Sequence, residues 1–152
     1  MSTQKGEIRR NLAAAGAVLF GIGMVTGLWL AAAATGDFPA LTKQLARGAH
    51  LNGLLGGLWM IAVAWTFEFL NYEDRGLKRL AWLVGLASWS NWLVTLIASF
   101  LNVNGLKYDS NVRNNVIAVL LQTTVVLPTL IGCVVWAWGF RRANGSNPTP
   151  VD

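Results

Sequence analysis

His50 is the only histidine among the 152 residues, and Cys133 is the only cysteine. One imidazole and one thiol exclude an intramolecular disulfide, a cysteine cluster and a metal site built from several histidines of one subunit. Gly53 and Gly57 follow His50 at three and seven residues, so on a helix they share its face. A neutral imidazole beside a strip without side chains suits a planar haem, whose iron commonly takes an imidazole as axial ligand. Two alternatives to a haem site stay open. Gly53 and Gly57 could instead be a small-residue motif for helix packing, and His50 could simply contact water at a membrane interface.

Arg47 and Cys133 are two further side chains that could bind a cofactor. Arg47 lies one helical turn before His50, where its guanidinium could pair with a haem propionate. Cys133 could offer a thiolate, but it lies deep in an apolar run, and we assign it a packing role.

Polar side chains interrupt the apolar segment that follows residue 80. On a helix, one stripe holds Ser88, Asn91, Trp92, Thr95 and Ser99. Inside a membrane such groups usually face the bundle interior or a wet cavity, because unpaired polar groups are costly in hydrocarbon. Each of them could instead simply bond a neighbouring helix. Together they favour a small polar pocket with aromatic rings beside it.

Four apolar runs must position these residues. The chain is 54% hydrophobic and only 12% charged, with a net charge of +5, whereas soluble domains contain about 25% charged residues. This composition argues against a nucleic-acid partner, and about 20 apolar residues span a bilayer as a helix. We therefore predict an all-α fold, an integral membrane four-helix bundle in one domain (residues 1–142), with a disordered tail at 143–152. The predicted spans are residues 12–35, 50–70, 80–101 and 114–140.

The Lys and Arg residues predict the orientation of this bundle. Eight lie on the side of the two termini, and four lie on the opposite side. Because cytoplasmic loops carry an excess of Lys and Arg, both termini are predicted to be cytoplasmic, in a multi-pass protein of the inner (cytoplasmic) membrane. The eight are Lys5, Arg9, Arg10, Arg75, Lys78, Arg79, Arg141 and Arg142.

Pro128 lies inside the fourth run, where a proline removes a backbone donor and frees a carbonyl one turn earlier. We expect a kink at this position. The hydroxyls of Thr123 and Thr124 are among the groups that could satisfy the freed carbonyl of Thr124.

Short segments in all four runs resemble the small four-span membrane isomerases, the family of hydroxylaminobenzene mutase and styrene oxide isomerase. The strongest part of this resemblance is an Ala-His pair, followed by a span that contains Asn at the same distance along the chain as in the isomerase. The segments are ARGAHLNGLLGG (46–57), WSNWLVTL (89–96), RRNL (9–12) with Gly16, Leu19, Phe20, Gly23 and TGL (26–28), and IGCVVWAWGF (131–140).

The resemblance implies a site as well as a fold. In styrene oxide isomerase the histidine of this motif ligates ferric haem b, held between the subunits of a trimer. Carried over by position, it implicates His50 as the axial ligand and places Trp89 and Asn91 in the substrate pocket. Both relatives have Asn where this chain has Gly56, and Asn52, one turn earlier, could supply that amide. In that case a Gly56→Asn variant would keep its turnover within a few fold.

The resemblance also implies a redox-neutral isomerisation. An arylhydroxylamine would become a 2-aminophenol, with ferric iron acting as Lewis acid on the N–O oxygen. Asn91 would orient the substrate, with Asn52 and Thr95 nearby and Trp89 or Trp92 stacking on a ring. Alternatives are a hydroxylaminobenzoate lyase that releases ammonia, and an epoxide isomerase. The epoxide reading is weakened because Ala87 and Thr95 replace that enzyme's acidic and tyrosyl residues.

Two readings without enzymatic activity stay open. One is a haem protein for electron transfer, which would favour two strong axial ligands. The other is a transport or assembly subunit, which would more often show an intramembrane charge or an internal repeat. For the enzyme, the expected partners are membrane lipid, a small aromatic substrate and two further copies of the chain in a homotrimer. The substrate would come from the degradation of aromatic compounds.

Overall fold

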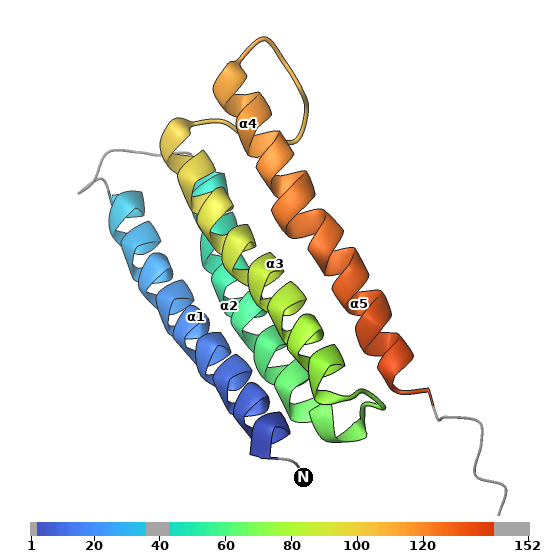
Figure 1. The fold of residues 1–152 in the computed structure, drawn as a ribbon. Coiled ribbons are helices and arrows are strands. Elements are labelled where there is room, and N and C mark those ends of the chain that lie inside the picture. The colour runs from blue at the N-terminus through green and yellow to red at the C-terminus, as the bar shows by residue number, and fades with distance from the viewer. Residues whose placement is uncertain (1–2, 36–42, 142–152) are drawn as a thin grey trace, which may run out of the picture.

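A computed structural model describes residues 3–35 and 43–141, and all regular structure in these two ranges is helical. The predicted tail at 143–152 lies outside the described residues. Figure 1 shows long helices running side by side, with the last three elements joined end to end into one rod. The elements are α1 (Thr3–Thr35), α2 (Lys43–Thr66), η1 (Phe67–Phe69), α3 (Asp74–Leu101), α4 (Val112–Leu120), η2 (Leu121–Val126) and α5 (Leu127–Gly139).

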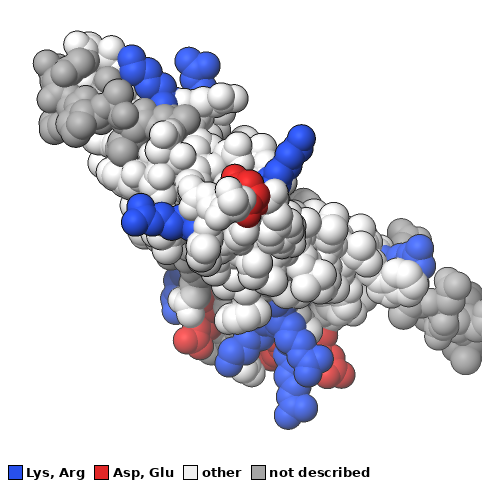
Figure 2. Space-filling model, turned by 90° about the horizontal axis from the view of Figure 1, so that it is seen from above, with Lys and Arg blue, Asp and Glu red and all other residues white. Residues whose placement is uncertain are grey.

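Each of the four rods is long and apolar enough to cross a membrane. Their candidate spans contain 27 to 29 residues, against the requirement of about 20. Only 22% to 33% of each most apolar window is buried within the chain, so most of the apolar surface needs lipid or another subunit to cover it. Figure 2 shows a mostly uncharged surface, with a group of charged side chains at its lower edge and others scattered singly. The predicted all-α membrane bundle is confirmed, and the chain is a multi-pass membrane protein.

The helices begin earlier than the apolar runs. The second rod begins at Lys43 and the third at Asp74, because polar first turns can extend the helices beyond the hydrocarbon. The start of α1 and the end of α5 lie at the same end of the bundle (Figure 1). There the backbone N–H of Asn71 donates to the carbonyl of Gly139 over 2.8 Å, and Arg9 pairs with Glu68.

Glycines let α1 and α2 approach closely. A Cβ built on Gly57 would lie 2.6 Å from the carbonyl oxygen of Gly16, and one on Gly23 would lie 2.8 Å from the backbone nitrogen of Leu54. Side chains from α1, α2, η1 and α3 form the main core. The fully buried members include Leu19, Met60, Val63, Phe67, Leu77 and Leu80.

Pro128 is preceded by a turn of π-helix, η2, rather than by a simple kink in an α-helix. The wider turn accommodates the missing backbone donor. The hydroxyls of Thr123 and Thr124 donate to the carbonyls of Val119 and Leu120, each 2.8 Å away. Neither hydroxyl, both candidates for the carbonyl of Thr124, therefore bonds to it. Cys133 is exposed on α5 rather than packed inside the chain.

Candidate functional site

The imidazole of His50 lies between α2 and α1, bonded to the backbone. Its Nδ1 lies 2.8 Å from the carbonyl oxygen of Gly23. A carbonyl oxygen only accepts, so Nδ1 carries a proton and donates, and in the neutral imidazole the lone pair is then on Nε2. Gly27 makes room for the ring, because a Cβ there would lie 2.6 Å from Cε1 of His50. The result is a fixed imidazole with one nitrogen ready to ligate a metal.

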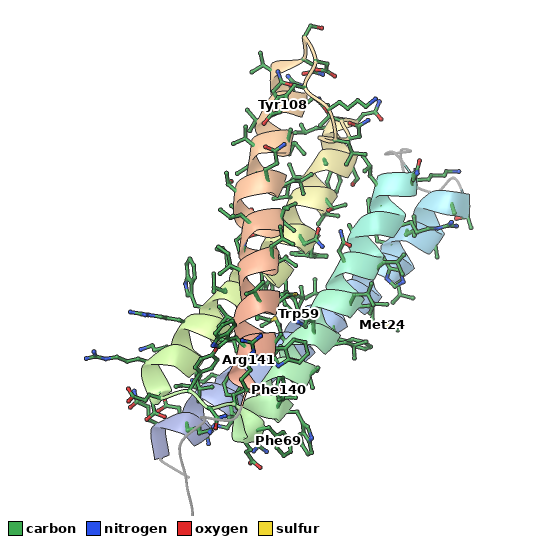
Figure 3. All side chains as sticks on the ribbon, turned by 90° about the vertical axis from the view of Figure 1, so that its right-hand side faces the viewer. Met24, Trp59, Phe69, Tyr108, Phe140 and Arg141 are labelled. Atoms are coloured by element: carbon green, nitrogen blue, oxygen red, sulfur yellow. The ribbon has the colours of Figure 1, made fainter. Side chains whose placement is uncertain are left out.

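A cavity of about 640 Å³ adjoins this imidazole. Lys43, Gln44 and Arg47 line it from α2, and apolar residues of α1 form the other wall. Figure 3 shows one of these, Met24, on the side of the bundle away from α5. A single imidazole, two cations and an apolar wall are the donor set that a haem with its two propionates requires. This cavity, called the His50 cavity below, therefore fits the predicted cofactor by the chemistry of its residues.

Gly53 and Gly57 do not contribute to this cavity. Both are buried against α1, where a Cβ on Gly53 would lie 2.7 Å from the Cα of Gly23. The strip that we expected to admit a planar haem is filled by a neighbouring helix, because two glycine-lined faces approach closely. Helix packing, the alternative for Gly53 and Gly57, is what the structure shows. The glycine beside the imidazole is Gly27, on the other helix.

The amide of Asn52 joins two residues of α3. Its Nδ2 donates to Oδ1 of Asn91 and to Oγ1 of Thr95, both 3.0 Å away. Within the described residues, Nδ2 of Asn91 forms no hydrogen bond, so its two N–H groups stay available. These three residues, called the amide cluster below, bring together the Asn52, Asn91 and Thr95 that the sequence predicted.

Two cavities meet at Asn91. One has a volume of about 230 Å³ and is also lined by Asn52, Trp59, Ser88 and Thr129. It is called the Trp59 cavity below. The other, of about 420 Å³, continues past Thr95 to the π-helical turn η2 and the loop that follows α3. Figure 3 shows the Trp59 side chain between α2 and α5. The amide cluster therefore borders a crevice between α2 and the fourth rod, with α3 as its floor.

The His50 cavity and the amide cluster lie on different sides of α2. His50 and Asn52 are two residues apart, which separates them by about 200° on a helix. Accordingly, His50 bonds to α1 and Asn52 bonds to α3. One chain therefore does not bring its own imidazole and amide cluster into one pocket.

Trp89 lies away from the amide cluster. It lines a separate cavity of about 490 Å³ together with α1 residues such as Leu12 and Ala15. Trp92 also faces α1, since its Nε1 donates to Oγ1 of Thr26 over 3.2 Å. The expectation that Trp89 shares a pocket with Asn91 is corrected, because these residues also stand about 200° apart on their helix.

Gly56 leaves little room for the asparagine of the relatives. A Cβ there would lie 3.1 Å from the Cβ of Ser88 and 3.3 Å from Cδ2 of Leu19. A larger side chain at this position would therefore require Ser88 and Leu19 to shift by a few tenths of an ångström. Asn52 lines the same Trp59 cavity as Gly56, as the one-turn spacing predicts.

Sequence reasoning missed Gly23, Gly27, Trp59 and Thr129. The spacing of Gly16, Gly23 and Gly27 on one face of α1 was a usable signal for the contact with α2. Trp59 and Thr129 carried no such signal, because only the packing of α2 against the fourth rod brings them together.

Comparisons with known proteins agree with this architecture. A family model described as styrene oxide isomerase matches residues 8–141. The chain is also similar to hydroxylaminobenzene mutase HabB of Ectopseudomonas oleovorans, with 25% identity across 93% of this chain and 87% of that protein. The match includes all four rods, His50 and the amide cluster. The chain therefore belongs to the styrene oxide isomerase family and is an isomerase.

Proposed function

We propose that this isomerase is a haem-dependent mutase of the inner membrane, which converts an arylhydroxylamine of the hydroxylaminobenzene type to a 2-aminophenol. The observation that carries the proposal is the bond between Nδ1 of His50 and the carbonyl of Gly23, which presents Nε2 as a ligand. The name of the similar mutase supports the substrate class. The chemistry that ferric haem b supplies when bound is Lewis acidity toward a substrate oxygen.

The residues of the His50 cavity would hold the cofactor. His50 would provide a nitrogen ligand for the iron, and Arg47 and Lys43 would provide cations for the propionates. The apolar residues of α1 exclude water from the ring.

The amide cluster would bind and orient the substrate. Because Asn52 occupies Oδ1 of Asn91, a residue that lines the crevice, the Nδ2 of Asn91 remains available as a donor. Trp59 offers an aromatic face to a substrate ring. These residues act by holding the substrate and need no ionisable group of their own.

We infer further that the complete site forms between copies of the chain in a homotrimer. The two halves of the site lie on opposite sides of α2, so a second copy is needed to bring an amide cluster to a His50 cavity. Exposed apolar residues beside that cavity, such as Leu28 with 72% of its surface exposed, would be covered by the neighbouring copy.

A lyase acting on a hydroxylaminobenzoate is the second candidate. Lys43 and Arg47 are exposed residues that line the same cavity as His50, where they could meet a substrate carboxylate instead of a propionate. The absence of a phenol at Thr95 and of a carboxylate at Ala87 gives an epoxide isomerase less support.

The test is an absorption spectrum and a turnover assay on protein purified in detergent. We expect a Soret band that is lost in His50→Ala and regained when imidazole is added to His50→Gly. Hydroxylaminobenzene should be converted to 2-aminophenol under air without a reductant, in preference to styrene oxide. Ammonia release from a hydroxylaminobenzoate would favour the lyase. A colourless wild type with full activity, or a requirement for NADH, would contradict the proposal.

A further inference from the structure

Ser88 on α3 carries a buried hydroxyl without a partner. The residue is 3% exposed, and its Oγ forms no hydrogen bond within the described part of the chain. A helical serine usually donates to a carbonyl one turn earlier. Ser99, on the same helix, does so over 2.7 Å to the carbonyl of Leu96. A buried hydroxyl that forgoes this bond destabilises the empty protein, which indicates that another molecule bonds it.

Ser88, whose hydroxyl is unpaired, lines the Trp59 cavity. Ser88 and Asn91 lie one helical turn apart on α3 and therefore face the same space. Gly56 and Ala87 line the cavity next to Ser88 with no side chain or only a methyl group, so no long side chain of theirs competes for its hydroxyl. Thr129 closes the cavity from α5.

The size of the cavity suits one substituted benzene ring. Its volume is about 230 Å³, whereas an apolar cavity of about 150 Å³ already accepts benzene. The remaining space allows one or two substituent atoms. Trp59 and Leu55 offer apolar contacts for the ring, and the polar atoms of Ser88 and Asn91 lie on the α3 side.

We propose that Ser88 is a substrate-positioning residue, whose hydroxyl bonds the nitrogen and oxygen substituents of an aromatic substrate while the ring contacts Trp59. A hydroxyl both donates and accepts, so it complements an N–H or an O–H equally well. The amide of Asn91 adds two donors beside it. This inference rests on the proposed function for its substrate, but the unpaired hydroxyl is a separate observation.

The test compares Ser88→Ala with Ser99→Ala on the same helix. Ser88→Ala removes an unpaired polar atom, so the Tm of the substrate-free protein should stay the same or rise. Its KM for hydroxylaminobenzene should rise about tenfold, with a smaller change in kcat, because the bound substrate loses one hydrogen bond. A tenfold change corresponds to about 1.4 kcal/mol of binding free energy. Ser99→Ala loses a satisfied bond, so its Tm should fall while its KM stays unchanged.

Binding of 2-aminophenol separates this inference from the proposed reaction. It should raise the Tm of the wild type and of Ser99→Ala, but not of Ser88→Ala. A wild-type KM and a wild-type thermal shift in Ser88→Ala would overturn the role of Ser88 and leave the mutase reaction standing. A shift that depends on Ser88, in a wild type that does not convert hydroxylaminobenzene, would support the site and overturn the reaction. No shift in the wild type would overturn the role of Ser88.

Discussion

The imidazole of His50 is oriented by a backbone oxygen on one side and by a missing side chain on the other. In Gly27→Ala, the new Cβ would lie 2.6 Å from Cε1 and 2.7 Å from Nδ1, so the ring must move and lose its bond to Gly23. Loss of the hydrogen-bond partner of a metal-ligating side chain lowers the affinity for the metal by roughly 10- to 100-fold. We expect the Soret absorbance per chain to fall about tenfold at free haem concentrations well below the Kd.

Gly21→Ala is the matched control for this variant, because it lies on the same helix with no atom within 4 Å of its added Cβ. It should keep the wild-type spectrum. Equal spectra for Gly27→Ala and Gly21→Ala would show that the imidazole does not need its present orientation to hold haem.

The amide of Asn52 fixes the direction of Asn91. In Asn52→Leu, Oδ1 of Asn91 and Oγ1 of Thr95 lose their common donor, and the side chain of Asn91 becomes free to rotate. Hydrogen bonds between membrane helices contribute about 0.6 kcal/mol each, so the loss of stability should be about 1 kcal/mol. We expect kcat/KM for hydroxylaminobenzene to fall more than tenfold, measured in detergent beside the thermal unfolding of each variant.

Thr95→Val separates the two bonds of this cluster. It removes one acceptor but leaves the bond from Asn52 to Asn91, so kcat/KM should fall less than in Asn52→Leu. If Asn52→Leu turned over at the wild-type rate, the orientation of Asn91 would have to be set by another contact.

The site could be predicted at the level of residue types but not of their partners. The scarcity of ionisable side chains led to His50, and the helical stripe led to Asn91 and Thr95. The partner of His50 is a backbone oxygen of another helix, for which no side chain leaves a pattern. The separation of His50 from Asn52 was within reach of sequence reasoning, because a helix turns by about 100° per residue.

Helices α1 and α2 pack through backbone rather than through large side chains. In Gly57→Ala, the added Cβ would lie 2.6 Å from the carbonyl oxygen of Gly16 and 2.7 Å from the backbone nitrogen of Phe20. Neither atom can rotate away, so the helices must separate, and such overpacking costs about 1–3 kcal/mol. We expect a lower Tm and loss of haem, because the His50 cavity lies between the same two helices.

The control for this packing is Gly85→Ala on α3, where the nearest atom is the flexible Cε of Met60 at 3.9 Å. Its Tm should be unchanged or higher, since alanine favours the helix by up to about 1 kcal/mol. A Gly57→Ala protein as stable as Gly85→Ala would contradict the close contact of α1 with α2.

The four rods can be predicted from the apolar runs, whereas the π-helical turn in the fourth rod cannot. Hydrocarbon requires every backbone group to be satisfied within the helix, so each long apolar run becomes one rod. Pro128 indicated that the fourth rod departs from regular geometry. The choice of a π-helical turn over residues 121–126 depends on how this rod packs against α3, which the sequence does not show.

For the whole molecule, the distribution of Lys and Arg predicts which end of the bundle faces the cytoplasm. The packing of the helices does not decide this orientation. Both ends of the described chain lie at the same end of the bundle (Figure 1), as four spans require. The loop between η1 and α3 lies at that end too, since Asn71 contacts Gly139. The loop between α3 and α4 lies at the opposite end. Because eight of the twelve Lys and Arg are on the side of the termini, that side should be cytoplasmic.

Single cysteines can report this orientation, because the chain has only Cys133 to remove. In a Cys133→Ala background, Ser110→Cys marks the loop after α3 and Glu73→Cys marks the loop before it; both residues are exposed. A charged maleimide that does not cross membranes should label Ser110→Cys in intact cells, and Glu73→Cys only after permeabilisation. The reverse pattern would invert the bundle and place the His50 cavity, at the end where α2 begins, near the cytoplasm. With the predicted pattern, Lys43 and Arg47 meet the outer face of the membrane, and a polar substrate group would reach them from that side.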